Sequence, residues 1–424
     1  MTKWQWIASQ LSRKLWIRTS LFAILALLSA LVSIILKPYI SADISALSGA
    51  EAVDSILHIL ASSMLAVTTF SLNIMVSAYS LATTSVTPRA TKLVAQDTTT
   101  QNVLSTFIGS FLYSLVGIVA IKMGVYGEQG RVILFIVTLG VIILIVITLL
   151  RWIQHLSTLG RLADTCQRVE HAAKNALEQQ AASPLYGANG WNGEADAIRA
   201  DIAIYSDSIG YLLHIDFLRL SKLADACEAK VYINLLPGKF IYQSTPLLWI
   251  VMEQGKAPDL NISHWKEAFT VGENRTFEQD PRFGLSVLAE VASRALSPAV
   301  NDPGTAIDII GRGIRLLTEW RNKLTEASYE VTHPRLFVVP LCKEDLFDDL
   351  FNPIARDGAA LLEVQLRLQK GLCELAKTDE DFFRSVAEQH ARLAWGYASA
   401  ALTLEHEKAT LKQVIDHFLL SKRV

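Results

Sequence analysis

The chain has 424 residues, which is enough for a membrane region and one or two soluble domains. Hydrophobic residues make up 51% of it and charged residues 19%, and the apolar excess is concentrated before Arg151. The formal net charge of −2 argues against a nucleic-acid partner and against a polybasic lipid-binding surface.

Four stretches of mostly apolar residues are each long enough to cross a bilayer as a helix. They lie at about Ser20–Leu36, Ser55–Ala82, Val103–Ile121 and Val132–Leu150. We expect the first stretch to be a retained span rather than a signal peptide, because it lacks a clear A-x-A cleavage site and three more apolar stretches follow. Small residues in the third stretch favour close helix packing: Ser105, Gly109 and Gly117.

Positive charges flanking these stretches predict their orientation. They precede the first span, lie between the second and third, and follow the fourth: Arg13, Lys14, Arg18, Arg89, Lys92 and Arg151. The positive-inside rule then puts both termini in the cytoplasm. The sequence therefore predicts a multi-pass protein of the inner membrane with four transmembrane helices.

A polar stripe runs the length of the second span. Its members recur at alternating spacings of three and four, so they share one helix face: Ser62, Ala66, Thr69, Asn73, Ser77, Ser80 and Thr84. Hydrocarbon cannot satisfy such a stripe, so it faces other protein or water. One interpretation is dry packing through small-x-x-x-small pairs. The other is a water-lined pore, built by copies of this helix around an oligomer axis.

Charged residues flank the stripe at both ends. Under the pore hypothesis, Glu51, Asp54 and His58 form an outer vestibule that concentrates cations. Arg89 and Lys92 form an inner mouth that opposes cations or admits anions. No charged residue lies in the middle of the span, which argues against a proton relay or a carboxylate-coupled transporter.

After the fourth span, the helical spacing of apolar residues predicts one continuous helix from Arg151 to Ala182. A breaker-rich segment, 183–193, follows it. Short alternating runs then predict strands, with a helix at Asp216–Ala226 among them: Ala200–Tyr205, Tyr211–Ile215, Lys230–Leu235 and Leu247–Val251. Together they suggest a small β-rich barrel or sandwich.

The rest of the chain reads as mainly helical. Asp280-Pro281 and Asp302-Pro303 each predict a helix start, with Asp as N-cap and Pro at the first helical position. A strand at Leu336–Val339 interrupts a helical bundle, whose further helices are expected near Glu344–Asp357, Ala359–Lys377, Glu380–His406 and Lys408–Leu420.

The predicted fold class is thus a mainly α membrane protein with a cytoplasmic α+β region. Its predicted parts are a four-helix transmembrane domain (1–154), a connecting helix and loop (155–194), the β-rich module (195–255) and the helical domain (256–424).

The sequence offers little to a catalytic hypothesis. It contains no G-x-S-x-G, no Walker-type phosphate loop, no G-x-G-x-x-G and no H-E-x-x-H. The four cysteines show no C-x-x-C pairing. We therefore expect no enzyme activity, no cofactor and no metal. The Asp302-Pro303 motif reads first as a helix cap, and a ligand or subunit contact is the alternative, with these candidate residues: Arg275, Asp280, Asn301, Asp302 and Arg312.

The run DPRFGLSVLAEVASRALSPAVNDPGTAI, from Asp280 to Ile307, closely resembles the signature of a bacterial family of predicted membrane proteins, domain of unknown function 2254. A phrase like ALSPAINDPFTA is typical of that family, and Gly304 stands where a bulky residue such as Phe is expected. The segments Thr87-Pro88-Arg89 and Pro237-Gly238-Lys239-Phe240 also match. The resemblance covers nearly the whole chain and implies residence in a bacterial membrane, but nothing about chemistry.

The functional hypothesis is an inner-membrane homo-oligomer that forms an ion channel or channel-like pore, gated by its cytoplasmic part. The predicted lining residues are Ser62, Thr69, Asn73, Ser77, Ser80 and Thr84. The alternative is a membrane-anchored sensor or scaffold, whose cytoplasmic domain binds a partner or small ligand without conduction. The expected partners are the lipid bilayer, further copies of the chain and inorganic ions, with no nucleic acid.

Overall fold

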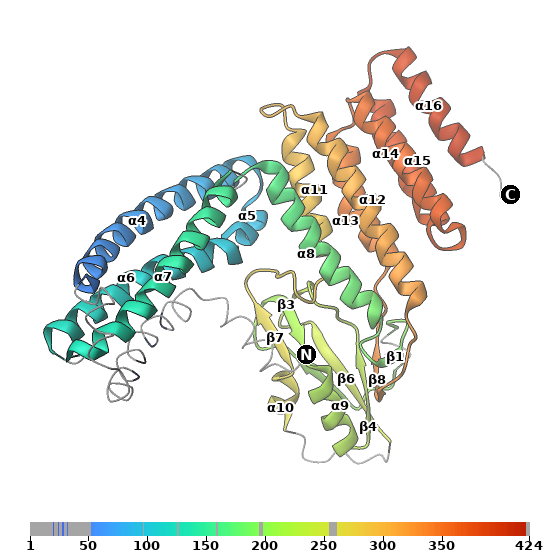
Figure 1. The fold of residues 1–424 in the computed structure, drawn as a ribbon. Helices are drawn as coiled ribbons and strands as arrows, with labels where there is room; N and C mark the ends of the chain where they lie inside the picture. Colours follow the sequence, from blue (N-terminus) through green and yellow to red (C-terminus); the bar gives the residue numbers. More distant parts are fainter. Residues whose placement is uncertain are drawn as a thin grey trace. The chain divides into compact units, whose positions relative to one another are not determined.

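The computed structural model describes residues 52–95, 97–124, 127–157, 160–194, 198–253 and 261–420, together with the single positions 20, 24, 28 and 32. The chain divides into two compact units, which we call the membrane unit (Ile7–Thr165) and the C-terminal unit (Cys166–Val424). Helices make up most of the described chain, as predicted (Figure 1).

The described part of the membrane unit begins with four helices: α4 (Val53–Ser85), α5 (Pro88–Ala95), α6 (Thr98–Lys122) and α7 (Gly127–Leu156). Three segments of these helices are long and apolar enough to cross a bilayer: Val53–Leu81, Thr98–Lys122 and Arg131–Leu156. They correspond to the second, third and fourth predicted spans. The first predicted span, Ser20–Leu36, lies outside the described residues except at the single positions given above, and stays a prediction.

The helices of the membrane unit pack around a shared apolar core that includes Leu57, Phe107 and Leu134. A Cβ atom at Gly117 of α6 would lie 3.0 Å from Cδ1 of Leu57, so the absence of a side chain there lets α4 and α6 approach closely. Ser105 and Gly109 are buried as well. The small residues of the third span therefore serve helix packing, as predicted.

The expected continuous helix from Arg151 to Ala182 is wrong. α7 ends at Leu156 and α8 begins again at Leu162 (Leu162–Ala182). Gly160 between them has φ +81°, and a Cβ there would lie 3.2 Å from the carbonyl oxygen of Ala78. The chain needs glycine at this point both for the left-handed backbone and for the close approach to α4.

The C-terminal unit contains two sheets. The five-stranded sheet has the order β1-β8-β4-β6-β2, with these bounds: β1 (Ala188–Gly190), β2 (Ile202–Tyr205), β4 (Ala229–Ile233), β6 (Pro246–Met252) and β8 (His333–Val338). The three-stranded sheet has the order β5-β3-β7: β3 (Gly210–Ile215), β5 (Phe240–Ile241) and β7 (Phe269–Gly272). β8 pairs in parallel with β1 and β4, whereas the other pairs are antiparallel.

Both sheets share one core with two short helices, α9 (Phe217–Ala226) and α10 (Ile262–Lys266). The predicted strands and the predicted helix, capped by Asp216, are present. The sheets, however, also take β1, β7 and β8 from outside residues 195–255. The barrel or sandwich form that we expected for that range is not confirmed.

The remaining helices pack on one another beside the sheets (Figure 1): α11 (Phe283–Ala295), α12 (Pro303–Glu326), α13 (Lys343–Asp357), α14 (Leu362–Thr378), α15 (Glu380–Ala401) and α16 (Glu405–Leu420). α12 starts at Pro303 with Asp302 as its cap, as predicted. α11 starts at Phe283 rather than at Pro281. Asp280 still bonds its first amides, because one carboxylate oxygen accepts from the amides of Arg282 and Phe283.

Candidate functional site

α4 packs on the rest of the membrane unit through one face only. The side chains buried on that face recur at helical spacing: Val53, Leu57, Leu60, Ala61, Met64, Thr68 and Ser71. α4 lies chiefly against α6. Beyond Ser71, none of the α4 side chains that the structure describes is buried.

The polar stripe lies on the opposite side of α4. Ser62 follows buried Leu60 by two residues and Asn73 follows buried Ser71 by two, which is a rotation of about 200° around the helix. All the stripe residues whose side chains are described are exposed: Ser62, Ala66, Thr69, Asn73, Ser77 and Ser80. The side chain of Thr84 lies outside the described residues. The stripe therefore does not pack against the described helices of its own subunit.

Hydrogen bonding distinguishes the members of the stripe. The hydroxyls of Ser62, Thr69 and Ser77 donate to backbone carbonyls of the preceding turn of α4, with the Thr69 bond to Leu65 at 2.9 Å. Such internally satisfied hydroxyls are compatible with lipid, protein or water. Among the described residues, the carboxamide of Asn73 has no hydrogen-bond partner. Asn73 is therefore the stripe residue whose surroundings matter most.

At the N-terminal end of α4, Asp54 lies near a lysine and a histidine. Its carboxylate is 4.0 Å from Nζ of Lys122 on α6 and 3.9 Å from Nε2 of His58. The Lys122 charge offsets the acidic vestibule that the sequence suggests. Glu51 lies outside the described residues. At the other end, Arg89 of α5 is exposed, and the side chain of Lys92 is again outside the described part.

A polar cluster that the sequence analysis missed joins α6 to α7. Asp97 caps α6, with its carboxylate accepting from the Thr100 amide at 2.8 Å and the Thr100 hydroxyl at 2.6 Å. Nε2 of His155, in the last turn of α7, lies 2.7 Å from the same carboxylate. Both side chains are largely buried. The capping pattern Asp97-x-x-Thr100 is visible in the sequence, but its partner His155 is not.

In the C-terminal unit, Arg275 and Asp280 form a buried pair. The guanidinium donates two hydrogen bonds to the carboxylate, at 2.7 and 3.0 Å. Burial raises the pKa of Asp280, while Arg275 and the amides of α11 act against that rise. A Cβ at Gly238, which has φ +97°, would clash with the Asp280 carboxylate. Asp280 thus holds the start of α11, and its carboxylate leaves no room for a side chain at position 238.

The other candidates for a ligand contact have separate partners. Asp302 accepts from the amide and the hydroxyl of Thr305. Arg312 donates to Asp308 at 2.6 Å and to Glu170 of α8 at 2.5 Å. Asn301 is exposed, with φ +50° in the tight loop before α12. Asp280 and Asp302 flank opposite ends of α11, whose 13 residues span about 20 Å. The structure therefore does not gather the five candidates into one site.

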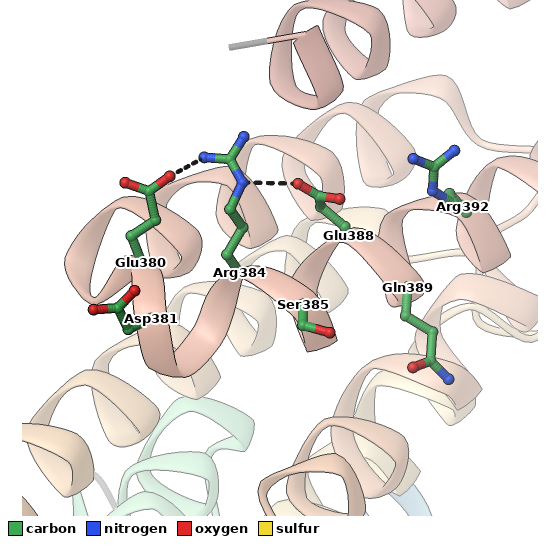
Figure 2. Close-up of a pocket in the computed structure, with 7 residues that line it drawn as sticks. All are labelled: Glu380, Asp381, Arg384, Ser385, Glu388, Gln389 and Arg392. Atoms are coloured by element: carbon green, nitrogen blue, oxygen red, sulfur yellow. Dashed lines mark hydrogen bonds and ion pairs between the residues drawn. The ribbon is translucent and has the colours of Figure 1, made fainter. Parts of the chain in front are cut away.

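A shallow pocket runs along one side of α15 (Figure 2). One helix supplies all its lining residues: Glu380, Asp381, Arg384, Ser385, Glu388, Gln389 and Arg392. Arg384 bridges Glu380 at 2.5 Å and Glu388 at 2.9 Å, as drawn in Figure 2. Such i, i+4 pairs are typical of a solvated helix face. Among the described residues, no group of three or more His, Cys, Asp or Glu is arranged to hold a metal.

The sequence matches a known family over residues 12–374, under the description "Predicted membrane protein (DUF2254)". Uncharacterized proteins of Mycobacterium bovis and Mycobacterium tuberculosis are each 34% identical to it over 105 residues, which is 24% of this chain. The chain spans about a fifth of the length of these curated relatives, 20% in each. No solved structure matches it. Since the family match covers most of the sequence, the chain belongs to the DUF2254 family of predicted membrane proteins.

Proposed function

We propose that this protein is a homo-oligomeric, channel-like pore of the bacterial inner membrane, in which α4 of each copy faces a central water-filled axis. The proposal includes four spans per subunit, cytoplasmic termini and a C-terminal unit that gates the pore or senses a signal. Inorganic ions are the proposed permeant species, and no catalytic role is proposed. The observation that carries the proposal is the direction of the polar stripe, away from the subunit's own core.

Asn73 makes lipid a costly neighbour for this face. α4 runs from Val53 to Ser85, so its midpoint is Thr69, and Asn73 lies about 6 Å further along the axis. That depth is within a hydrocarbon core about 30 Å thick. An unpaired amide costs about 4–8 kcal/mol on transfer from water to hydrocarbon. Water or a neighbouring copy removes that cost.

Apolar side chains flank the stripe on both sides. Leu65 and Leu72 are exposed on one flank, at 53% and 38%, and Phe70 and Leu81 on the other, at 64% and 56%. A polar line between two apolar shoulders is the pattern of a pore-lining helix whose shoulders pack against adjacent helices of a ring. The stripe runs the length of the span, whereas a close helix crossing needs only two or three small residues.

The side chains of the stripe define what the proposed pore would offer an ion. Hydroxyls and one amide can bind a partly hydrated ion of either sign, because each group carries both donor and acceptor atoms. The charge of Asp54 is offset by Lys122, so the described charges support no strong preference between cations and anions. We therefore propose weak charge selectivity.

Cysteine labelling in membranes tests the proposal. Ser62→Cys, Thr69→Cys and Ser77→Cys are expected to react with a charged, water-soluble thiol reagent. Leu72→Cys on the apolar flank and Ser71→Cys on the buried face are matched controls that are expected to be protected. The wild-type protein gives the background, since it has four cysteines of which Cys342 is exposed. Protection at all three stripe positions would instead favour the anchored sensor or scaffold.

Conductance provides the second test. Purified protein in planar bilayers is expected to conduct, and Asn73→Leu is expected to lower that conductance, because it places an isobutyl group at the middle of the lining. A wild-type protein that is silent under voltage, tension and pH changes, with Asn73→Leu indistinguishable from it, would contradict a pore.

A further inference from the structure

The three-stranded sheet carries aromatic side chains on its outer face. Leu212 of β3 and Ile241 of β5 lie in the core that the two sheets share. Tyr211 and Phe240 are opposite each other on the other face, with ring centroids 4.9 Å apart. Tyr242 continues this row, with its ring 5.1 Å from Phe240. Aromatic residues thus stand where an antiparallel sheet that faces water usually carries polar ones.

We call Ile209, Tyr211, Phe240 and Tyr242 the aromatic face. Ile209 is 58% exposed, Phe240 39% and Tyr242 57%, whereas Tyr211 is half-buried. Since a large aromatic side chain has about 150–250 Å² of surface, the aromatic face exposes on the order of 300 Å². Contiguous apolar patches of a few hundred Å² on a protein surface are often functional.

The size of the aromatic face argues against a second copy of the chain as its partner. A stable interface between proteins buries about 800 Å² on each side, well above the area exposed here. Exposed charged residues border the face, so its apolar surface does not extend further: Asp207, Lys239 and Glu273. Asp207 forms an ion pair with Lys266.

The chemistry of the aromatic face suits the interface of a lipid bilayer. Aromatic rings favour the region between the headgroups and the acyl chains, where the hydroxyl of a tyrosine stays hydrated. The charges of Lys239 and Glu273 balance each other, and Asp207 is already paired. The rings, rather than a net charge, therefore supply the attraction.

The chain keeps the aromatic face within reach of a bilayer. α8 begins at Leu162, shortly after the end of α7, which is apolar enough to span. The backbone of Gly284 in α11 lies against Ala173, about 16 Å along α8 from its first residue. Asp280, just before α11, contacts Gly238 in the turn that leads into β5. Because a span anchors this unit, the bilayer is a partner at high effective concentration.

We propose that the aromatic face is a lipid-docking surface: Ile209, Phe240 and Tyr242 insert into the interface of the bilayer that anchors the chain. Docking holds β3 and β5 at the membrane and limits the movement of the C-terminal unit away from it. The proposal concerns this lipid contact alone and does not depend on whether α4 lines a pore.

Photo-crosslinking of the full chain in lipid nanodiscs tests the proposal. A photoreactive amino acid at Tyr242 is expected to form adducts with phosphatidylcholine and phosphatidylglycerol, identified by mass spectrometry. The same group at Lys230 of β4 is the control, because Lys230 is exposed on the outer face of the other sheet. We expect about tenfold more lipid adduct at Tyr242 than at Lys230. Equal yields at both positions, or adducts at Tyr242 with a second copy or with residues 1–19 in place of lipid, would overturn the proposal.

A variant of the face makes the test specific. Ile209→Ser with Phe240→Ser removes apolar groups beside Tyr242 and is expected to lower the lipid adduct there to the yield at Lys230. An unchanged melting temperature checks that this variant folds, since both side chains are exposed. Replacing phosphatidylglycerol by phosphatidylcholine is expected to leave the yield unchanged. A lipid adduct that persists in the folded double variant, or that requires the anionic lipid, would contradict docking through the rings.

Discussion

The carboxylate of Asp97 lies 2.7 Å from Nε2 of His155, which ties the first turn of α6 to the last turn of α7. The same carboxylate accepts two hydrogen bonds from Thr100. A single buried side chain therefore caps one span and fastens another. A second buried polar contact, between the hydroxyls of Tyr113 and Thr138 at 3.0 Å, joins the same two helices within the spans, whereas the Asp97 contact lies where α7 is about to end.

We expect Asp97→Ala to destabilise the membrane unit by about 2 kcal/mol, from the lost helix cap and the lost charged contact. The free energy of unfolding can be measured by denaturation in mixed micelles. Thr98→Ala, one residue further along and exposed, is the control and should change stability by less than about 0.5 kcal/mol. Equal stability of the two variants would mean that the contact is unimportant.

Replacing glycine by alanine should lower stability at the break after α7 but not within α7. Gly160→Ala forces an alanine into φ +81° and places its Cβ against the backbone of Ala78, so we expect a loss of about 1–3 kcal/mol. Gly140→Ala lies within α7, where a Cβ would meet nothing within 4 Å. It should be neutral or stabilising, by up to about 1 kcal/mol. Thermal melts of both variants in one detergent test this difference.

Charge substitution at Asn73 should change ion selectivity if α4 faces water. Asn73→Asp would put one carboxylate per copy near the middle of the lining, and we expect the cation-to-anion permeability ratio to rise about tenfold. Asn73→Lys should shift the ratio the other way. Reversal potentials in a salt gradient measure both. Identical reversal potentials for the two variants would argue that the side chain does not meet the permeating ion.

Asp379 should make the C-terminal unit less stable in acid. It caps α15 through the Phe382 amide at 3.0 Å and bonds Arg321 of α12 at 2.7 Å. Partial burial alone would raise its pKa, but these hydrogen bonds and the Arg321 charge outweigh burial and hold the pKa below 3.8. A lowered pKa in the folded state gives stability that is present above pH 3.8 and lost as pH falls through the folded value.

The matched variant for this prediction is Asp379→Asn, which should be less stable than the wild type by about 1 kcal/mol at pH 7. This difference in the free energy of unfolding should become smaller as the pH falls below about 4. Unfolding followed by tryptophan fluorescence across this range measures the difference, because Trp320 of α12 lies near this contact, with its ring 5.8 Å from Phe382. A difference that is constant with pH would contradict a lowered pKa of Asp379.

Local signals in the sequence predict much of this fold. Long apolar runs locate the three described spans, and Asp302-Pro303 locates the start of α12. The sequence did not predict the break at Gly160, because apolar residues keep helical spacing across it: Leu156, Leu159, Leu162 and Cys166. One glycine in such a pattern does not reveal that the backbone beside it must turn left-handed against another helix.

The sequence likewise predicts one part of the candidate site and not the rest. Helical spacing alone predicts the stripe of α4, but not which face of α4 meets α6, because Thr68 and Ser71 on the buried face are as polar as Ser62. The pairs Asp97–His155 and Asp348–His390 join different helices, and no local pattern connects their members. Such contacts exist only once the helices have packed.

The position of β8 has a consequence for how the chain is made. β8 lies between β1 and β4, and the side chain of Asn189 reaches the carbonyl of Pro334, 145 residues later. During synthesis, a chain that has been made as far as α12 still lacks β8, the strand between β1 and β4. Until β8 is made, β1 and β4 have unpaired edges on which the strands of other chains can pair. Truncation before His333 should therefore yield aggregates rather than a shorter soluble unit.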